Sequence, residues 1–319
     1  MLLYIHFSGD DDMKHRKELK RQRKIIVISL FTVLLCLSIG YAAFSTNINL
    51  SAKGNLKDKS RTIQSWSETS NEDFHTDFYR ENIVSATFLD NAVVPSDAVE
   101  KWDVSEAKDQ GVMAYVMEST SETGKYNLYI GAKNGVIANQ YSYNFFYKFK
   151  NLKYINFNNN FDTNNVVDFT YFFGICTSLI SVDLNNFNTS KTTKMGGMFE
   201  ENSSIEYIDV SNFDTNNVVS MWYMFARCYN LKELDVSNFI TSNVVNMEYM
   251  FSSTYNIEEL NLCNFDTKNI SRTDHMFAYT NNLKNVYVGT NWKIPKNANS
   301  SNMFTDSNIS SVTTGKCNS

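Results

Sequence analysis

The sequence contains very little proline and glycine. Its 319 residues include two prolines and 12 glycines, too few for a collagen-like, proline-rich or glycine–serine linker architecture. The four histidines are scattered, and no glycine-rich phosphate loop, Gly-x-Ser-x-Gly elbow or His-Glu-x-x-His motif occurs. We therefore predict that the protein is not an enzyme and needs no cofactor.

Excess positive charge is also missing from most of the chain. The net charge is −5, although residues 1–24 carry seven Lys or Arg against four Asp or Glu. The rest of the chain is therefore acidic, and it lacks the basic surface on which nucleic-acid affinity depends. We predict no nucleic-acid partner.

Apolar residues are plentiful by contrast. Hydrophobic residues make up 43% of the chain and aromatic residues 14%. The low hydrophobicity and high net charge of disordered chains are thus absent. The chain is expected to fold around a substantial core.

The N-terminal part is typical of an exported protein. Residues 25–44 form an uncharged segment of twenty residues, long enough as a helix to cross a bilayer of about 30 Å. The basic segment 1–24 would stay in the cytoplasm. The same pattern fits a signal peptide cleaved near Ala42. We expect a cell-surface, single-pass protein held in the membrane by Ile25–Phe44 with its body outside, or a secreted one after cleavage.

Two segments separate this helix from the main body. Residues 45–82 are polar and are expected to form a spacer. Residues 83–145 contain apolar residues that alternate with polar ones, as in Val84, Ala86 and Phe88, which indicates strands with one buried face. This part is expected to be a small β-rich cap.

The remainder is a repeat of 26 residues. The motif Asn-Phe-x-Thr recurs at that spacing five times, beginning at Asn160, Asn186, Asn212, Asn238 and Asn264. Each copy follows a strand-like Leu/Ile/Val pattern, and Met-Phe pairs recur between the copies. Such a period with one short strand per unit is typical of a leucine-rich-repeat-like solenoid.

We therefore predict an α/β repeat solenoid over residues 146–304 with a tail at 305–319, preceded by the cap and the transmembrane or signal helix. About six coils would combine short parallel strands with short helical returns, because Val244, Met247 and Phe251 are three and four residues apart. The asparagines would bond main-chain groups at the bends. Two interior columns would be formed by Phe187, Phe213, Phe239 and Phe265, and by Phe199, Phe225, Phe251 and Phe277.

The segment from Leu231 to Phe251 resembles the repeat of BspA-like (DUF285) surface proteins, because the strand, Asn-Phe-x-Thr and Met-Phe elements occur together in order. The resemblance implies a surface-exposed or secreted protein of the kind implicated in adhesion to host matrix proteins and in coaggregation. Compared with ordinary leucine-rich repeats, the asparagine of this repeat lies one position closer to the start of the unit.

The cysteines show no paired spacing. Cys176 and Cys228 occupy the same repeat position two coils apart, about 10 Å at the spacing of parallel strands, which is too far for a disulfide. Cys263 lies in another column and Cys317 near the end. We expect Cys176, Cys228 and Cys263 to be free.

One polar row on the outward strand face is the candidate binding site. It contains Asp183, Asp209 and Asp235, about 5 Å apart, where repulsion would raise their pKa values. The row could form a weak calcium site or an acidic track for a basic partner; alternatively, these residues only hydrogen-bond to neighbouring serines. Tyr154, Tyr207 and Tyr287 could add contact area.

These features favour a non-catalytic protein that binds proteins or glycans on host or neighbouring cells through its strand face. One alternative is a structural envelope or biofilm-matrix protein that assembles through the ends of the repeat array. A glycan-active enzyme would need two carboxylates facing each other across a cleft, whereas the Asp row is collinear.

Overall fold

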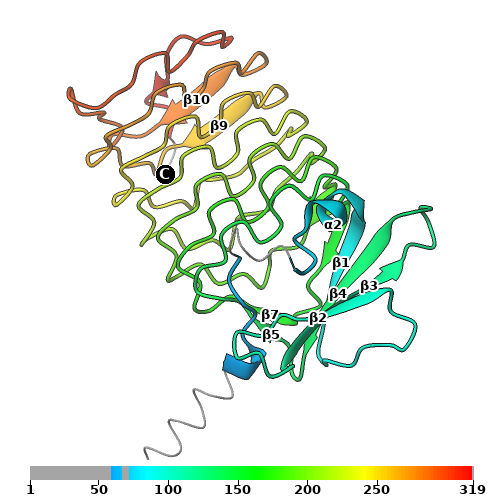
Figure 1. Ribbon diagram of the computed structural model, residues 1–319. Helices are drawn as coiled ribbons and strands as arrows, with labels where there is room; N and C mark the ends of the chain where they lie inside the picture. Colours follow the sequence, from blue (N-terminus) through cyan, green and yellow to red (C-terminus); the bar gives the residue numbers. More distant parts are fainter. Residues whose placement is uncertain (1–58, 67–71, 318–319) are drawn as a thin grey trace, which may run out of the picture. The chain divides into compact units, whose positions relative to one another are not determined.

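The computed structural model describes residues 59–66 and 72–317. The fold is built mainly from strands, bridges and turns. Within the described residues, α-helix is confined to residues 59–61 and to α2 (Asp77–Asn82). A twisted sheet at the N-terminal end leads into a stack of short coils (Figure 1).

The N-terminal sheet has six strands in the order β2-β3-β4-β1-β6-β8. Its strand β1 pairs in parallel with β4 on one side and with β6 on the other, so the sheet continues directly into the first coils. Along β1 the apolar residues Ala86 and Phe88 point into the core. The strands are β1 (Ile83–Leu89), β2 (Glu100–Asp103), β3 (Val112–Glu118), β4 (Tyr126–Ala132), β6 (Tyr154–Asn156) and β8 (Ser181–Val182).

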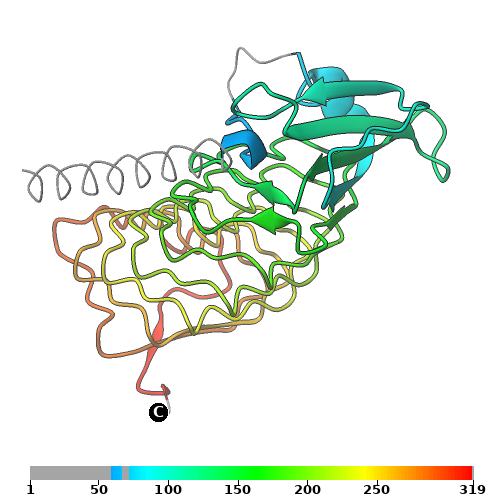
Figure 2. The ribbon, with the colours of Figure 1, turned by 90° about the horizontal axis from the view of Figure 1, so that it is seen from below.

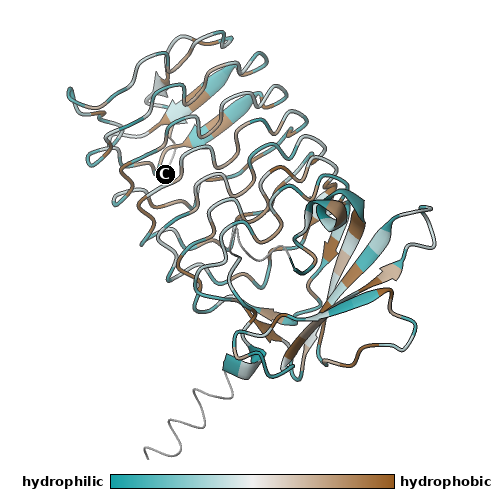
Figure 3. Ribbon diagram, viewed as in Figure 1, coloured by the Kyte–Doolittle hydropathy of each residue, from teal (hydrophilic) through white to brown (hydrophobic). Residues whose placement is uncertain are grey.

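Two smaller sheets lie farther along the chain. The first pairs two short strands, β5 (Val136–Ile137) and β7 (Phe161–Asp162), in parallel. The second places β10 (Asn285–Val288) between β9 (Glu259–Leu262) and β11 (Thr313–Thr314), all parallel. Hydrophobic and hydrophilic residues alternate along β9 and β10 (Figure 3), as expected for strands with one buried face.

Successive coils of residues 141–314, here called the coil stack, lie in parallel register (Figure 2). Isolated parallel bridges join equivalent residues of neighbouring coils, running from Tyr141 through Asp168, Lys194, Ser220, Asn246 and Arg272 to Asn299. A coil therefore satisfies its backbone mainly through its neighbours, and it buries its apolar side chains against them.

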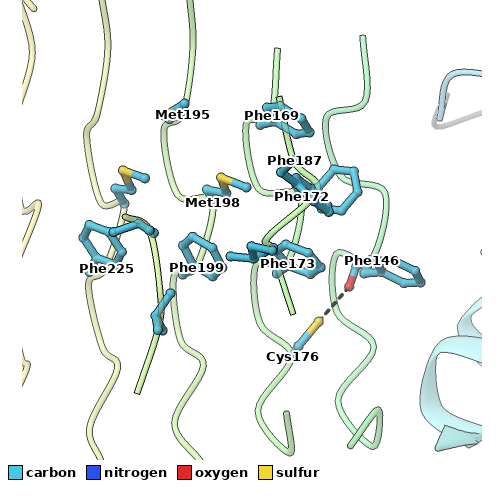
Figure 4. Packing of buried hydrophobic residues seen from close by; sticks show 14 of the residues in the cluster. Phe146, Phe169, Phe172, Phe173, Cys176, Phe187, Met195, Met198, Phe199 and Phe225 are labelled. Atoms are coloured by element: carbon cyan, nitrogen blue, oxygen red, sulfur yellow. Dashed lines mark hydrogen bonds between the residues drawn. The ribbon is translucent and has the colours of Figure 1, made fainter. Parts of the chain in front are cut away.

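A ladder of phenylalanine rings runs through the core of the coil stack (Figure 4). The rings are buried, except that Phe304 at the end is half-buried. Their centroids lie 5.4 to 6.0 Å apart, and neighbouring planes differ by at most 17°. The members of this Phe ladder are Phe146, Phe173, Phe199, Phe225, Phe251, Phe277 and Phe304. The phenylalanines of the Asn-Phe-x-Thr motifs are also buried, at another position of each coil: Phe161, Phe187, Phe213, Phe239 and Phe265.

The threonine of the motif joins each coil to the next through two hydrogen bonds. Thr189 Oγ1 accepts from the backbone N–H of Asp214 at 2.8 Å and donates to the Asp214 carbonyl at 2.9 Å. Thr163, Thr215 and Thr241 make the same pair of bonds to one residue of the following coil. Thr267 instead accepts from the Lys293 N–H and donates to the Asn291 carbonyl. All five threonines are buried, so these bonds are shielded from water.

The asparagine of the motif bonds in the opposite direction, to the preceding coil. The amide of Asn238 donates to the carbonyls of Val210, Ser211 and Phe213 at 3.1, 3.2 and 3.1 Å. Asn212 makes the equivalent three bonds, while Asn160 and Asn264 each donate to one carbonyl and Asn186 donates to Asn159. This column therefore satisfies carbonyl groups at the bends.

Replacing Asn238 with leucine should lower the free energy of unfolding by about 2–3 kcal/mol, because three carbonyls, two of them in partly buried bonds, lose their donor. Asn243→Leu is a suitable control, because Asn243 donates only one exposed bond, to Asn216, and its loss should cost about 1 kcal/mol or less. Chemical denaturation of both variants measures the difference. Equal losses would show that the asparagine column does not support the bends.

The predicted α/β fold with helical returns is wrong. Residues 141–317, all of which the structure describes, contain no α-helix. Alternate N–H groups of the returns bond to the next coil, as in Phe225 to the Met250 carbonyl at 3.0 Å. Those between them bond three residues back, as in Met224 to the Met221 carbonyl at 3.2 Å, rather than four residues back as in an α-helix. Positive φ angles at Tyr249 and Ser253, of 54° and 60°, also interrupt any helix. The spacing of three and four residues arises from consecutive tight turns.

The predicted transmembrane or signal helix, and the localisation based on it, are not upheld either. In the part of the chain that the structure describes, no helix has both the length and the apolar character needed to cross a membrane. Residues 25–44, on which the prediction rested, lie outside the described residues, as does the basic segment 1–24.

Part of the expected polar spacer, 45–82, belongs to the folded body. The side chains of Ile63, Phe74 and Tyr79 are buried. His75 hydrogen-bonds to the Asp73 carboxylate at 2.9 Å and to the Phe145 carbonyl at 3.0 Å. The few apolar residues in this segment therefore cover the first coil, although the segment as a whole is polar.

Candidate functional site

The outward strand face carries two neighbouring rows of side chains, one residue from each coil. The first row contains Tyr154, Ser181, Tyr207, Glu233, Glu259 and Asn285, whose register follows from the strand pairs and a bridge. The second row lies two residues farther along each coil and contains Asn156, Asp183, Asp209, Asp235, Asn261 and Tyr287. The six predicted site residues thus share one face.

Each aspartate of the second row is held by the turn that follows it. The Oδ1 atoms of Asp183, Asp209 and Asp235 accept from the N–H groups two residues later, at 3.0, 2.9 and 2.9 Å. These bonds support the turns, as Asx turns do. At Asp209 the expectation that repulsion raises the pKa is wrong, because hydrogen bonds from the Ser211 side chain and backbone hold the pKa of Asp209 below its usual value.

The calcium interpretation gains no support from this geometry. Among the described residues, no group of three or more His, Cys, Asp or Glu side chains is arranged to hold a metal ion. Since a calcium ion requires six to eight oxygen ligands, a straight row of carboxylates with one oxygen already bonded to the backbone is a poor site.

Several of the predicted residues line a large groove over the last coils, here called the strand-face groove. It has a volume of about 1060 Å³, and Tyr207, Asp235 and Tyr287 are among its lining residues. Of the other predicted residues, Asp183 lines a cavity of about 90 Å³ beside Asn186 and Phe187. Tyr154 lies at the N-terminal end of the face and is 56% exposed. The structure therefore brings together one half of the predicted set.

A disulfide between Cys263 and Cys317 places the C-terminal tail along this groove. Their Cα atoms lie 5.6 Å apart, and Lys316 and Cys317 both line the groove. The expectation that Cys263 is free is wrong, because its partner follows the last repeat, where the 26-residue period gives no register. Cys176 and Cys228 are free and buried, and burial raises the pKa of both thiols.

The charges beside the groove are only partly neutralised. Along its side, Lys232 pairs with Glu206 and Lys284 pairs with Glu258, each at 2.7 Å. The carboxylate of Glu233, in contrast, has no ion pair or hydrogen bond within the described residues. Glu259 only accepts hydrogen bonds, from Asn285 at 2.8 Å and from Tyr287 at 3.2 Å.

The C-terminal tail brings a basic side chain, Lys316, over the ring of Tyr287 in the groove. Lys316 Nζ is 5.8 Å from the ring centroid of Tyr287, within the range of a cation–π contact. Glu233, Asp235 and Glu259 together exceed this positive charge. The groove therefore combines the exposed ring of Tyr207 and the half-buried ring of Tyr287 with an excess of negative charge, an arrangement suited to basic side chains. Sequence reasoning missed Glu233, Glu259 and Lys316; the 26-residue register predicts the first two beside Asp235, but gives no position for Lys316.

Comparison with known proteins gives one match. A family model described as Mycoplasma protein of unknown function, DUF285, matches residues 141–234 and 202–314. No curated protein and no solved structure matches the chain. The matched residues coincide with the coil stack, and they confirm the resemblance noted from the repeat motif.

Proposed function

The chain belongs to the DUF285 family, and we propose that it is a non-catalytic binding protein that engages protein or glycan partners through the outward strand face of its coil stack. The strand-face groove carries this proposal, because it gathers Tyr207, Asp235 and Tyr287 into one concave surface. Concave surfaces of repeat arrays commonly serve as extended binding surfaces.

The chemistry of the groove favours a partner that presents basic side chains. Tyr207 is 55% exposed, and tyrosine rings are enriched in interfaces because they bury a large area at a small entropic cost. The uncompensated carboxylates of Glu233 and Asp235 would attract Lys or Arg groups and steer their approach. A rigid face that makes several weak contacts binds with a higher overall affinity when the partner offers several basic groups.

A decalysine peptide is a simple probe of this proposal. We expect the chain to bind decalysine and not decaglutamate, with an affinity that falls as ionic strength rises. The double variant Glu233→Gln/Asp235→Asn should bind decalysine about tenfold more weakly. Isothermal titration calorimetry at two salt concentrations measures both effects.

The matched control is Glu118→Gln/Asp214→Asn, which removes the same net charge from positions outside the groove. It should leave decalysine binding nearly unchanged. If both double variants weaken binding equally, the attraction is a property of the acidic chain as a whole and the strand-face proposal fails.

A further inference from the structure

A second groove lies on the returns of the coil stack and shares no lining residue with the strand-face groove. Residues of four successive coils line its volume of about 520 Å³. Its rings come from Tyr143, Tyr171 and Trp222, and its charged groups from Asp168 and Lys194. At about 4.8 Å per coil, the groove extends for ~14 Å along the stack. We call it the aromatic groove.

Two glycines make room for its aromatic wall. At the repeat positions of Gly196 and Gly197, the next coil carries Trp222 and Tyr223. A Cβ atom on Gly196 would lie 2.5 Å from the indole of Trp222, and one on Gly197 would overlap the ring of Tyr171. The rings of Tyr171 and Trp222 therefore meet edge to face, 5.3 Å apart, across a coil that has no side chain there.

The backbone does not require aromatic residues at this position. The residue equivalent to Tyr171 has a left-handed φ of 54° to 57° in Tyr171, Tyr223, Tyr249 and His275, a conformation that disfavours bulky side chains. The position four residues later has φ angles of 58° to 60°, yet it carries Ile175, Glu201, Arg227, Ser253 and Tyr279. Since one conformation accepts such varied residues, the backbone does not account for the ring of Tyr171, which is the member of this series that lines the aromatic groove.

The lining of the aromatic groove has no net charge, and some of its polar side chains have no hydrogen-bond partner in the part of the protein that the structure describes. Asp168 and Lys194 are its only charged lining residues, and they pair with each other at 3.3 Å. Within the described residues, five half-buried side chains of the lining lack a hydrogen-bond partner for their polar group: Tyr143, Asn144, Thr170, Ser220 and Trp222. The site therefore offers ring faces and free hydroxyl and N–H groups without net charge.

We propose that the aromatic groove binds a neutral, extended oligosaccharide. A pyranose ring with equatorial hydroxyls presents a flat C–H face that can lie on an aromatic ring, while its hydroxyls bond at the edge to groups such as Thr170, Ser220 and the Trp222 N–H. The length of the groove suits several sugar units in a row. The absence of net charge disfavours both anionic glycans and basic peptides. This inference is independent of the strand-face proposal.

Titration of the full chain with cellohexaose and chitohexaose, followed by tryptophan fluorescence and calorimetry, tests this inference. We expect saturable binding of at least one of the two, with a change in tryptophan emission that is lost in Trp222→Ala. Trp222→Ala should weaken binding at least about tenfold, and Trp222→Phe, which keeps a ring but removes the N–H donor, should weaken it less. Thermal melting of each variant verifies that the coil stack is intact.

Tyr249→Ala is the matched control. Tyr249 has the same repeat position and backbone conformation as Tyr171 but lies outside the aromatic groove, so its loss should leave the affinity unchanged. Three results would overturn the inference: no binding of either oligosaccharide up to ~1 mM, equal affinity of wild type and Trp222→Ala, or binding restricted to an anionic polymer such as dextran sulfate.

Discussion

Replacing Phe225 with alanine is expected to lower the free energy of unfolding by about 3–5 kcal/mol. Phe225 is fully buried, and its ring stacks on Phe199 at 5.8 Å and on Phe251 at 6.0 Å. The truncation interrupts the Phe ladder in the middle, where the coils on both sides are fixed and cannot collapse into the cavity. Urea denaturation and thermal melting measure the loss.

Ile240→Ala provides the comparison within the same coil stack. Ile240 is also a large apolar residue, but its side chain is 44% exposed and points away from the core. Its truncation should change the free energy of unfolding by about 0.5 kcal/mol or less. If Phe225→Ala and Ile240→Ala melt alike, the ladder does not hold the coils together.

Removing the disulfide is expected to cost about 4 kcal/mol. The bond between Cys263 and Cys317 closes a loop over a sequence separation of 54 residues. Such a cross-link lowers the conformational entropy of the unfolded chain, and for a loop of this length the resulting stabilisation is about 4 kcal/mol. The double variant Cys263→Ser/Cys317→Ser should therefore melt at a lower temperature than the oxidised wild type. Loss of the bond also frees Lys316 from its place beside Tyr287.

Treatment with a reducing agent separates the effect of losing the disulfide from any effect of the serine substitutions themselves. It should lower the melting temperature of the wild type towards that of the double variant, and it should not change the variant. Cys176 and Cys228 are buried and far from the bond in sequence, so they should not contribute. An unchanged wild-type melting curve after complete reduction would show that the tail adds no stability.

Local patterns in the sequence were sufficient for the parts of the fold that repeat or alternate. The alternation of Val84, Ala86 and Phe88 marks strand β1, and the 26-residue period places Phe225 and Asn238 at equivalent points of successive coils. Both patterns report directly which side chains face the core. The returns were misread because apolar residues three and four apart fit a helix and a series of tight turns equally well. The φ angles and the hydrogen bonds to the next coil distinguish the two.

The candidate site was predictable only where the period applies. The register places Tyr207 and Asp235 on the same face, and the strand-face groove contains both. The position of Lys316 depends instead on a disulfide to a tail that has no repeat partner. The aromatic groove depends on Gly196 and Gly197, where the sequence departs from its own repeat. Such departures carry information that the period itself does not.

Carbodiimide cross-linking of decalysine to the chain tests the central claim, binding at the strand face, most directly. The reagent joins an amine to a carboxylate only where the two are in contact, and mass spectrometry then identifies the carboxylates involved. The proposal predicts cross-links concentrated on Glu233, Asp235 and Glu259, which line the strand-face groove. Cross-links spread evenly over the chain, or found mainly at positions such as Glu118 and Asp214, would contradict it.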